Sequence, residues 1–345
     1  MTERKGIIVF IILFLNLFVC AGESISIAAV GDIMLGTTFP DAVLPKSQGI
    51  MLMKAADSIL IFADIAFGNL EAPFTECELL RKDSTDTCKY AFRTPPYLAS
   101  ALKNAGFDAF TLANNHVRDF GDKGLKDTKQ TLQEFGIKYT GMKNEIAKFE
   151  RDGSKIAIVG FAPYYGMNNM CNIEESKKLI KTLSDSFDIV IVTFHGGSEG
   201  TDAQHVYDAE ESLFGENRGN VYKFSHAMID AGADLVVGHG PHVLRAMELY
   251  KGRLIAYSLG NFCTYAKINT FGISGYAPVI LVNLQKDGSF KDGRIYSFKQ
   301  KYRQGIAVDN EYSASNQIRK LSYEDFPESS PVIDDRGYIS IPKSY

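Results

Sequence analysis

The feature that most constrains this chain is a repeated pattern in which a short apolar run is followed directly by a polar cluster. Each apolar run has the length and composition of a buried strand. The clusters are, in chain order, Gly31-Asp32, Gly68-Asn69-Leu70-Glu71, Asn114-Asn115-His116, His195-Gly196-Gly197, Gly238-His239-Gly240-Pro241-His242 and Ser258-Leu259-Gly260-Asn261-Phe262. Because open α/β sheets bind ligands beyond the carboxyl ends of their strands, we expect these clusters to converge from distant parts of the sequence.

Length and composition are those of a folded globular protein. The chain has 345 residues, of which 45% are hydrophobic and 12% aromatic, enough for one large core or two modest ones. With 37 Lys and Arg against 41 Asp and Glu, the net charge is only -4, so no nucleic-acid partner is indicated. Recognition of an anion would therefore need a local device such as a metal ion.

The amino terminus is typical of an export signal. Arg4 and Lys5 precede a long apolar run, and the small residue Ala21 follows it. Residues 1–21 are therefore predicted to be a signal peptide or an N-terminal membrane anchor, which places the rest of the protein outside the cytoplasmic membrane. Three outcomes stay open: cleavage after Ala21, lipidation at Cys20, or a retained helix of about 25 Å, short against a bilayer core of about 30 Å.

Cysteine usage fits an exported protein. Beyond residue 21 the chain has Cys77, Cys88, Cys171 and Cys263, an even number in a compartment where disulfides persist. Cys77 and Cys88 are the predicted disulfide because they bracket a polar, charge-mixed stretch typical of an exposed loop; free thiols are the alternative. The sequence does not decide whether Cys171 pairs with Cys263.

The order of apolar runs and helical patterns predicts an α/β fold. Strands are predicted at residues 25–30, 65–67, 109–112, 155–161, 188–194 and 235–237. Helices are predicted at residues 51–62, 97–105, 121–135, 174–183 and 220–231. The runs 155–161 and 188–194 lack polar alternation, so these strands are expected to be buried on both faces.

Beyond residue 243 the pattern changes to an antiparallel one. A hairpin is predicted from residues 244–250 and 254–257, and a second from residues 277–284 and 294–299, each around a Gly-containing turn. Residues 313–345 are polar and weakly periodic. Only a short helix near residues 316–321 is predicted there, with otherwise irregular structure.

The polar clusters contain the ligand types of a two-metal hydrolytic site. Carboxylate, amide oxygen and imidazole form a mixed O/N set that suits Mn, Fe or Zn. The candidate ligands are Asp32, Glu71, Asn115, His195, His239 and His242. Two divalent ions would lower the pKa of a shared water and neutralise charge on a phosphoryl or acyl oxygen. His116 could then protonate the leaving group.

Several candidates also have a structural interpretation that the sequence leaves open. Asp32 can cap the segment after its strand, and Asn114 and Asn115 can be turn residues. His239 and His242 give the sharpest functional signal, because two imidazoles around a Gly-Pro turn have little use in packing.

Four polar residues are candidates for contact with a substrate: Asn114, Glu199, Ser258 and Asn261. Ser258 and Asn261 have the alternative of closing a turn. His205 and His226 follow no predicted strand, so they are expected to be structural or exposed to solvent.

Six motifs in order carry a resemblance to a known family: Gly31-Asp32-Ile33-Met34, Asn69-Leu70-Glu71, Asn114-Asn115-His116, His195-Gly-Gly-Ser-Glu199, Gly238-His-Gly-Pro-His242 and Ser258-Leu-Gly-Asn-Phe262. The chain resembles the CapA family of poly-γ-glutamate capsule biosynthesis proteins, a branch of the calcineurin-like metallophosphoesterase superfamily. The resemblance covers roughly residues 25–298 and implies a four-layer sandwich of two mixed β-sheets flanked by helices. A CapA-type domain is thus expected over residues 22–300, followed by an extension over residues 301–345 that packs on the domain or is partly irregular.

The resemblance also implies how the metal ligands are shared. Asp32 and His242 would bind one metal, and Asn115, His195 and His239 would bind the other. Glu71 would bridge the two, where the wider superfamily usually has Asp. His116 would take the leaving-group role.

Two departures from the wider pattern bear on activity. Met34 stands where the superfamily has a His, which would weaken the first metal position, although Met looks typical of the CapA branch. Gly196 stands where many members carry an aromatic residue, which would open the pocket floor.

The sequence predicts an exported, metal-dependent, hydrolase-like protein. The resemblance to the CapA family alone implies a role in the synthesis, release or anchoring of an anionic polymer such as poly-γ-glutamate. One alternative is a phosphomonoesterase or phosphodiesterase. Another is a non-catalytic accessory subunit of a membrane polymer synthase. Met34 favours the accessory role, and His116 favours the enzyme.

Overall fold

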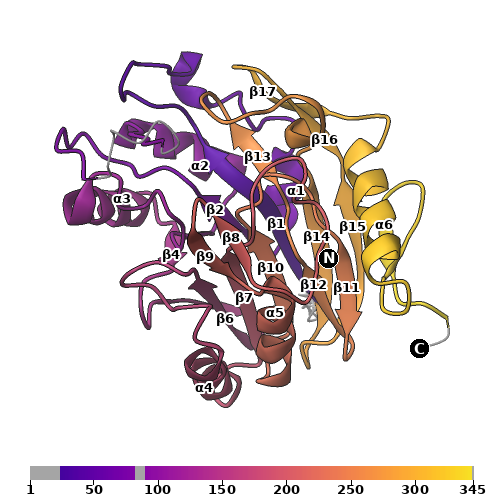
Figure 1. Cartoon of the computed structure of the whole chain (residues 1–345). Helices are drawn as coiled ribbons and strands as arrows, with labels where there is room; N and C mark the ends of the chain where they lie inside the picture. Colours follow the sequence, from indigo (N-terminus) through magenta and orange to yellow (C-terminus); the bar gives the residue numbers. More distant parts are fainter. Residues whose placement is uncertain (1–23, 82–89, 344–345) are drawn as a thin grey trace, which may run out of the picture.

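The computed structural model describes residues 24–81 and 90–343, and its two β-sheets pack against each other with helices around them (Figure 1). The predicted export segment, residues 1–21, lies outside the described residues. Within the described part of the chain, no helix has the length and apolar character needed to cross a membrane.

The first sheet holds nine strands within the described ranges, in the order β18-β19-β15-β14-β1-β2-β3-β4, with β13 also paired to β1. Their bounds are β1 Ser24–Met34, β2 Ile65–Leu70, β3 Ala109–Thr111, β4 Lys138–Thr140, β13 Asn261–Thr264, β14 Val279–Gln285, β15 Phe290–Tyr296, β18 Val332–Ile333 and β19 Tyr338–Ser340. Strand β1 pairs in parallel with β2 and β13 and antiparallel with β14, so the sheet is mixed.

The second sheet holds six strands in the order β11-β12-β10-β7-β6-β5. Their bounds are β5 Ile146–Arg151, β6 Ser154–Phe161, β7 Ile189–His195, β10 Leu235–His239, β11 Met247–Tyr250 and β12 Arg253–Ala256. The four central strands are parallel and the two outer strands are antiparallel to their neighbours. Two small hairpins stand apart, β8 Glu211–Leu213 with β9 Glu216–Gly219 and β16 Phe298–Lys301 with β17 Gly305–Val308.

The helices in the described residues are α1 Asp57–Phe62, α2 Ala99–Ala105, α3 Gly121–Glu134, α4 Ile173–Ser184, α5 Val221–Asp230 and α6 Ser313–Asp325, with 3-10 turns η1 Lys46–Gly49, η2 Pro96–Leu98 and η3 Gly272–Gly275. Asparagine side chains cap two of them, as the Asx preference at helix starts predicts. Asn172 accepts from the backbone N–H of Glu175 at the start of α4, and Asn220 accepts from that of Lys223 at the start of α5.

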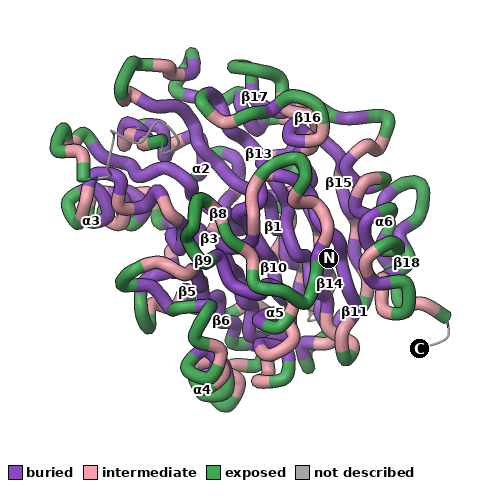
Figure 2. Tube along the Cα trace, viewed as in Figure 1, coloured by how far each residue is buried: buried purple, intermediate pink, exposed green. Residues whose placement is uncertain are grey.

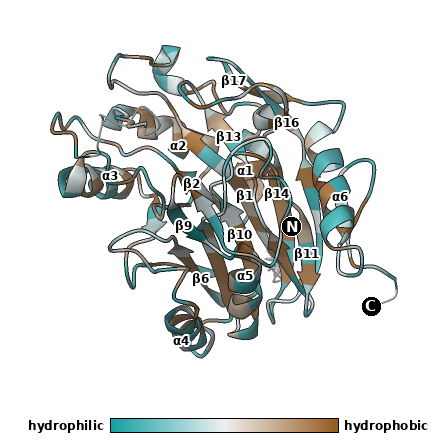
Figure 3. Ribbon diagram, viewed as in Figure 1, coloured by the Kyte–Doolittle hydropathy of each residue, from teal (hydrophilic) through white to brown (hydrophobic). Residues whose placement is uncertain are grey.

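Side chains alternate along the strands between a core shared by the two sheets and the cores under the helices. In β1, Ile27 and Ala29 enter the shared core, where they join residues such as Ile191 of the second sheet. The alternate residues of β1, including Val30, pack with α1, α2 and α3, and those of β7, including Val192, pack with α4 and α5. Strands are accordingly buried and apolar while the outer faces of the helices are exposed and polar (Figures 2 and 3). This arrangement confirms the predicted four-layer α/β sandwich of two mixed sheets flanked by helices.

The predicted elements differ from the structure at several places before the carboxyl terminus. Helix α1 begins only at residue 57, after a series of turns. The strands β4 and β5 were not predicted. The antiparallel pattern beyond residue 243 is only partly right, because β12 also pairs in parallel with β10 and β13 pairs in parallel with β1.

The prediction of mostly irregular structure after residue 312 is wrong. Helix α6 is longer than predicted, and β18 and β19 extend the first sheet beyond β15. Helix α6 inserts Ala314 and Ile318 into the shared core. Its buried positions also include Ser315 and Ser322. Because small and polar residues occupy part of the buried face, the apolar periodicity is too weak to read from the sequence.

Candidate metal centre

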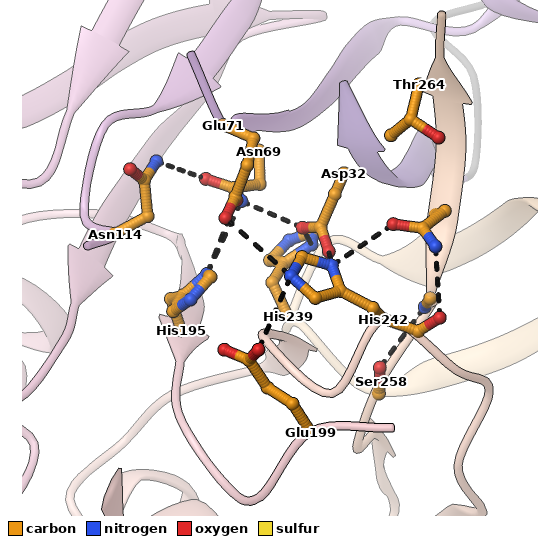
Figure 4. Close-up of polar contacts among 12 residues, drawn as sticks. Asp32, Asn69, Glu71, Asn114, His195, Glu199, His239, His242, Ser258 and Thr264 are labelled. Carbon is orange, nitrogen blue, oxygen red and sulfur yellow. Dashed lines mark hydrogen bonds and ion pairs between the residues drawn. The ribbon is translucent and has the colours of Figure 1, made fainter. Parts of the chain in front are cut away.

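The carboxyl ends of strands from both sheets bring the polar clusters together. Asp32 of β1 lies in register with Asn69 of β2 and Asn261 of β13, and His239 of β10 lies beside His195 of β7. Among them, Asp32, Asn69, His195 and His239 point toward one another from the ends of their strands (Figure 4). The predicted convergence at the strand ends is therefore present in the structure.

Asp32 is the central acceptor of the first half of the site. It is fully buried, with Oδ2 2.9 Å from Nδ1 of His242 and Oδ1 3.5 Å from Nδ1 of His239. His242 has a left-handed backbone, with φ of 57°. Such a conformation is costly for a residue with a side chain, and it is typical of positions that a site requires. The neighbouring Gly240 turns the chain so that two histidines face one carboxylate.

Glu71 joins this half of the site to the other. Its Oε1 is 3.9 Å from Nε2 of His242, and its Oε2 is 3.7 Å from Nδ1 of His195. Both Glu71 and His195 are fully buried. Ligand atoms of Asp32, Glu71 and His195 all lie within 4.8 Å of one another, close enough to surround one metal ion.

The amide of Asn69 stands among the same three residues. Its Nδ2 donates to Asp32 Oδ1 at 2.8 Å and to Glu71 Oε2, and it lies 3.5 Å from His195 Nδ1. Its orientation follows from Asn114, whose Oδ1 accepts from the backbone N–H groups of His116 and Val117 and whose Nδ2 donates to Asn69 Oδ1. Asn114, a predicted substrate contact, thus serves to orient Asn69.

His116 is held at the edge of the centre. Its Nδ1 is 2.9 Å from Asp119 Oδ2, and its Nε2 is 3.9 Å from Glu71 Oε1. The Phe92 ring packs on the imidazole at 4.4 Å between centroids. A carboxylate on Nδ1 fixes the ring with Nε2 toward the centre, which is the arrangement that a proton donor or acceptor requires.

Burial and the crowded carboxylates shift the pKa values of these groups. Burial alone would raise the pKa of Asp32, but the imidazoles of His239 and His242 lower it well below its usual range. Burial and the Asp32 charge raise the pKa of Glu71 to about 8. Burial would lower the pKa of His242, yet its hydrogen bond to Asp32 raises it to about 10. Burial, with the Arg218 charge, lowers the pKa of His195 well below its usual value.

The donor set fits a divalent metal. Four buried atoms make no hydrogen bond to any described residue: Glu71 Oε1, His195 Nε2, and both ring nitrogens of His239. Buried polar atoms are rarely left unpaired without a functional reason. In addition, the raised pKa values of Glu71 and His242 favour protons at positions where a cation would favour the deprotonated ligands. Carboxylate and imidazole ligands suit Mn, Fe or Zn.

The remaining predicted residues have varied places. Asn261 Oδ1 is 3.1 Å from Nδ1 of His242, and its Nδ2 donates to the carbonyls of His242 and Ser274, so it holds the loop beside the centre. Ser258 donates to the Val243 carbonyl and closes a turn. Glu199 Oε2 is 4.0 Å from Nε2 of His242. Asn115 follows Asn114 and is partly exposed as a residue, while its side-chain Oδ1 is buried.

His205 and His226 fit the structural role predicted for them. His205 pairs with Asp325 of α6, and His226 pairs with Glu248 of β11. Of the cysteines, Cys88 lies outside the described residues, so the Cys77–Cys88 disulfide stays a prediction. Cys171 is exposed and Cys263 is buried, and neither is bonded to another described cysteine.

Sequence analysis gave no role to three residues near the centre, Asn69, Arg218 and Tyr164. Arg218 is 1% exposed and lies 3.0 Å from Glu199. Its Cζ is 5.8 Å from the centre of the Tyr164 ring, which lies 6.4 Å from the His195 ring. Asn69 was within a predicted cluster, so its strand-end position could have identified it. No spacing signal marked Arg218 or Tyr164.

Comparison with known proteins agrees with the resemblance. Residues 26–266 match the family model described as bacterial capsule synthesis protein PGA_cap. The capsule biosynthesis protein CapA of Bacillus anthracis is 28% identical over 260 residues, which cover 70% of this chain and 60% of that protein. The PGA biosynthesis protein CapA of Bacillus subtilis (strain 168) is 29% identical over 282 residues, 74% of this chain and 70% of that protein. The chain therefore spans only part of the length of these relatives.

More distant likenesses occur among solved structures and other relatives. A probable polyglutamine synthesis accessory protein of Mycobacterium tuberculosis (strain CDC 1551 / Oshkosh) is 26% identical over 287 residues, 67% of this chain and 72% of that protein. The structure of a 5'-nucleotidase precursor from Thermus thermophilus aligns with a TM-score of 0.45 and 12% identity, over 87% of this chain and 59% of that chain. Because the family model matches most of its length, the chain belongs to the bacterial capsule synthesis protein family PGA_cap, in agreement with its resemblance to CapA.

Proposed function

We propose that this chain is an exported, metal-dependent, hydrolase-like protein in the synthesis, release or anchoring of an anionic capsule polymer such as poly-γ-glutamate. The observation that carries the proposal is the buried cluster of carboxylates and imidazoles at the strand ends, with ligand atoms that make no hydrogen bond to any described residue. Membership of the capsule synthesis family supports the polymer as the substrate class.

The geometry supports two metal positions that share Glu71. Asp32 and His242 are adjacent, as two ligands of one ion would be. His195 lies on the other side of Glu71, and the two Glu71 oxygens reach toward both sides, as a bridging ligand requires. His239 is close to Asp32 and can serve either position, and Asn115 would complete the second. Bound divalent ions would activate a water and neutralise developing charge on the substrate.

The residues of the chain itself would position the proton transfer. Asp119 orients His116, whose Nε2 faces the centre and would carry a proton to the leaving group. Asn114 and Asn261 hold the loops that present the ligands.

Two measurements test this proposal. The first is the metal content of the whole chain by elemental mass spectrometry after incubation with Mn, Fe or Zn, compared with the His239→Ala/His242→Ala variant. We expect two ions per chain and their loss in the variant. The second is turnover of poly-γ-glutamate, with a phosphate monoester as the competing substrate class. The His116→Ala variant should lose turnover and keep its metal. Cleavage of the phosphate ester but not of the polymer would mean that the substrate is a phosphoester rather than poly-γ-glutamate.

A specific observation supports a second candidate, a non-catalytic accessory subunit of a membrane polymer synthase. Met34 is fully buried with Ala72 and Phe92, and its Sδ accepts from the backbone N–H of Gly36 at 3.2 Å. A thioether in that environment adds no ligand for Mn, Fe or Zn. In the accessory role, neither the unaltered chain nor the His116→Ala variant would show turnover. The variant would instead lose binding to the polymer or to the synthase.

Export is part of the proposal and has its own test. The charged start and apolar run of residues 1–21 support it, together with an even number of cysteines beyond them. Mass spectrometry of the protein recovered from the producing cell identifies the mature N-terminus, which distinguishes cleavage after Ala21 from a lipidated Cys20 or a retained anchor. The same spectrum under non-reducing conditions reports whether Cys77 and Cys88 are bonded.

A further inference from the structure

Arg218 brings a buried positive charge to the border of the metal centre. It lies in β9 and is 1% exposed. A Cβ added to Gly240, between the two candidate ligands His239 and His242, would lie 3.1 Å from Arg218 Nη2. The guanidinium also lies over the Tyr164 ring. Its position is therefore beside the histidines and within the protein.

The donors of this guanidinium are only partly used. Nη1 is 3.0 Å from Glu199 Oε1. Even so, Nε and Nη2 of Arg218 and Oε1 of Glu199 are buried and make no hydrogen bond within the described part of the chain. The pair is thus a charge contact without the aligned, two-fold hydrogen bonding that makes arginine–carboxylate pairs strong. Because unpaired buried donors are costly, a better-placed carboxylate would be favoured there.

The Glu199 carboxylate stands between Arg218 and the metal centre. While Oε1 faces Arg218, Oε2 lies 4.0 Å from Nε2 of His242, and the close-up shows the side chain reaching toward that ring (Figure 4). The Glu199 side chain is 23% exposed, more than any ligand of the centre that it contacts. This carboxylate is therefore accessible enough to be exchanged.

The loop that carries Glu199 is fixed on both sides of it. The backbone N–H of Ser198 donates to Glu211 Oε2 at 2.8 Å, and that of Gly200 donates to the Pro241 carbonyl at 3.0 Å. Glu211 in turn is held by Arg245. Exchange of the Glu199 side chain at Arg218 would therefore rely on side-chain rotation rather than on movement of the loop.

We propose that Arg218 anchors a carboxylate-binding subsite beside the metal centre, and that Glu199 occupies this subsite until a carboxylate of the ligand displaces it. A carboxylate is the fitting anion because the group that faces Arg218 is itself a carboxylate, and a guanidinium can hold a planar carboxylate through two parallel bonds. The ligand class is a carboxylate-bearing chain such as one of glutamyl residues. The inference rests on the proposed function for the location of the reacting centre.

The test is calorimetric titration of the purified, Mn-loaded whole chain with the dipeptide γ-glutamylglutamate, and with inorganic phosphate as the comparison anion. Glu199→Gln removes the competing charge at nearly constant shape, so the dipeptide should bind several-fold more tightly. Arg218→Gln should weaken binding at least about tenfold. Arg218→Lys should weaken it by a smaller factor, because lysine keeps the charge and lacks the planar fork.

Two exposed charges give matched controls. Glu210→Gln and Arg336→Gln remove the same charges from the surface, and dipeptide binding should stay within about twofold of the unaltered chain. A gain in affinity with Glu199→Gln cannot come from unfolding, so the proposal stays testable even where Arg218→Gln fails to fold. Three results would overturn it: unchanged affinity in Glu199→Gln and Arg218→Lys, no dipeptide binding to any form, or phosphate bound more tightly than the dipeptide.

This experiment separates the subsite from the hydrolase proposal, because calorimetry reads binding without turnover. Dipeptide binding that depends on Arg218 in a chain that cleaves no polymer would support the subsite and end the hydrolase proposal. The opposite result is cleavage of polymer by a chain whose dipeptide affinity does not change when Arg218 is replaced. It would support the hydrolase proposal and end the subsite proposal.

Discussion

The side-chain amide of Asn69 donates to both acidic side chains of the centre. Asp32 and Glu71 both accept from its Nδ2, and Asn114 fixes the orientation of the amide. The amide thus stabilises the carboxylates without adding a charge. A carboxylate at the same position would remove these donors and add a second negative charge beside Asp32.

We therefore expect Asn69→Asp to make the centre more dependent on metal. The metal-free variant should lose about 1–3 kcal/mol of unfolding free energy, since buried donors are lost and like charges gained. Its affinity for Mn should rise, because a further carboxylate faces the same centre. The measurement is Tm by circular dichroism in EDTA and in excess Mn. Asn283→Asp is the control, since Asn283 also donates to a carboxylate, that of Asp292, in the strand pair β14–β15. Equal Mn-induced Tm shifts in the variant and the unaltered chain would refute the argument.

The pKa shifts predict how metal binding changes with pH. The folded, metal-free state raises the pKa of Glu71 from 4.5 to about 8 and that of His242 from 6.5 to about 10. Because both pKa values are raised, the metal-free folded state holds protons that the unfolded chain releases. The contribution of these two groups to stability therefore falls as pH rises from 6 toward 10. Metal binding favours the deprotonated forms of both groups, so the Mn-loaded chain should not lose this stability as the pH rises.

The difference in Tm between the Mn-loaded and the metal-free chain should accordingly widen between pH 6 and pH 8. Subtracting the two Tm values at each pH cancels the titration of groups remote from the centre, so the comparison needs no further variant. A gap that stays constant or narrows over this interval would contradict the proton occupancy described for Glu71 and His242.

At this scale, strand-end position alone identified most of the candidate centre. Asp32, Glu71, His195, His239 and His242 were predicted because each follows an apolar run. Arg218 could not be found in this way, since it belongs to a short polar hairpin and its partner Glu199 comes from another loop. Pairing between distant polar loops leaves no periodic trace in a sequence.

At the scale of elements, β1 and the turn that precedes β13 meet so closely that position 31 requires a glycine. A Cβ at Gly31 of β1 would lie only 2.1 Å from the carbonyl oxygen of Gly260. The same carbonyl accepts from the backbone N–H of Asp32 at 2.9 Å. The register between β1 and β13, which sets Asp32 beside Asn261, depends on this contact.

Gly31→Ala should therefore damage the fold and the centre together. A backbone shift is needed to relieve the overlap, so we expect a loss of at least about 2 kcal/mol in unfolding free energy by urea titration. We also expect metal content to fall below that of the unaltered chain. Gly252→Ala is the control: it has φ of 72° and no atom within 4 Å of the added Cβ, so it should cost about 1 kcal/mol and leave metal content unchanged. Full metal content in Gly31→Ala would show that the contact does not position Asp32.

The elements that the sequence failed to predict share a physical property. The buried strands with continuous apolar runs, such as β6, β7 and β10, were all predicted. Strand β4 has only three residues, and β5 lies at a sheet edge with alternating exposed residues, so neither has such a run. Strand β13 was missed because its sequence Asn261–Thr264 begins with a polar residue of the centre.

At the scale of the whole molecule, the segment after residue 308 packs against both sheets of the sandwich. Helix α6 contributes to the shared core and to the core under the second sheet. Its Ser322 accepts from the backbone N–H of Met247 in β11, and its Asp325 pairs with His205 in the loop that follows β7. Strand β19 pairs with β15 of the first sheet. This one segment therefore contacts both sheets, which its weak periodicity did not reveal.

A chain that ends at Val308 should consequently fail to fold. Besides Ala314, it lacks five large buried apolar side chains, Ile318, Leu321, Phe326, Ile333 and Ile339. At about 1.5–3 kcal/mol for each large buried side chain, their combined loss is comparable to the stability of about 5–15 kcal/mol that domains possess. We expect no cooperative thermal transition by circular dichroism and aggregation on size exclusion, whereas a chain ending at Ile341 should keep the Tm of the whole chain. A monomeric chain ending at Val308 with an unchanged Tm would instead make residues 309–345 a dispensable extension, since cooperative unfolding without α6 requires each sheet to be stable without this shared helix.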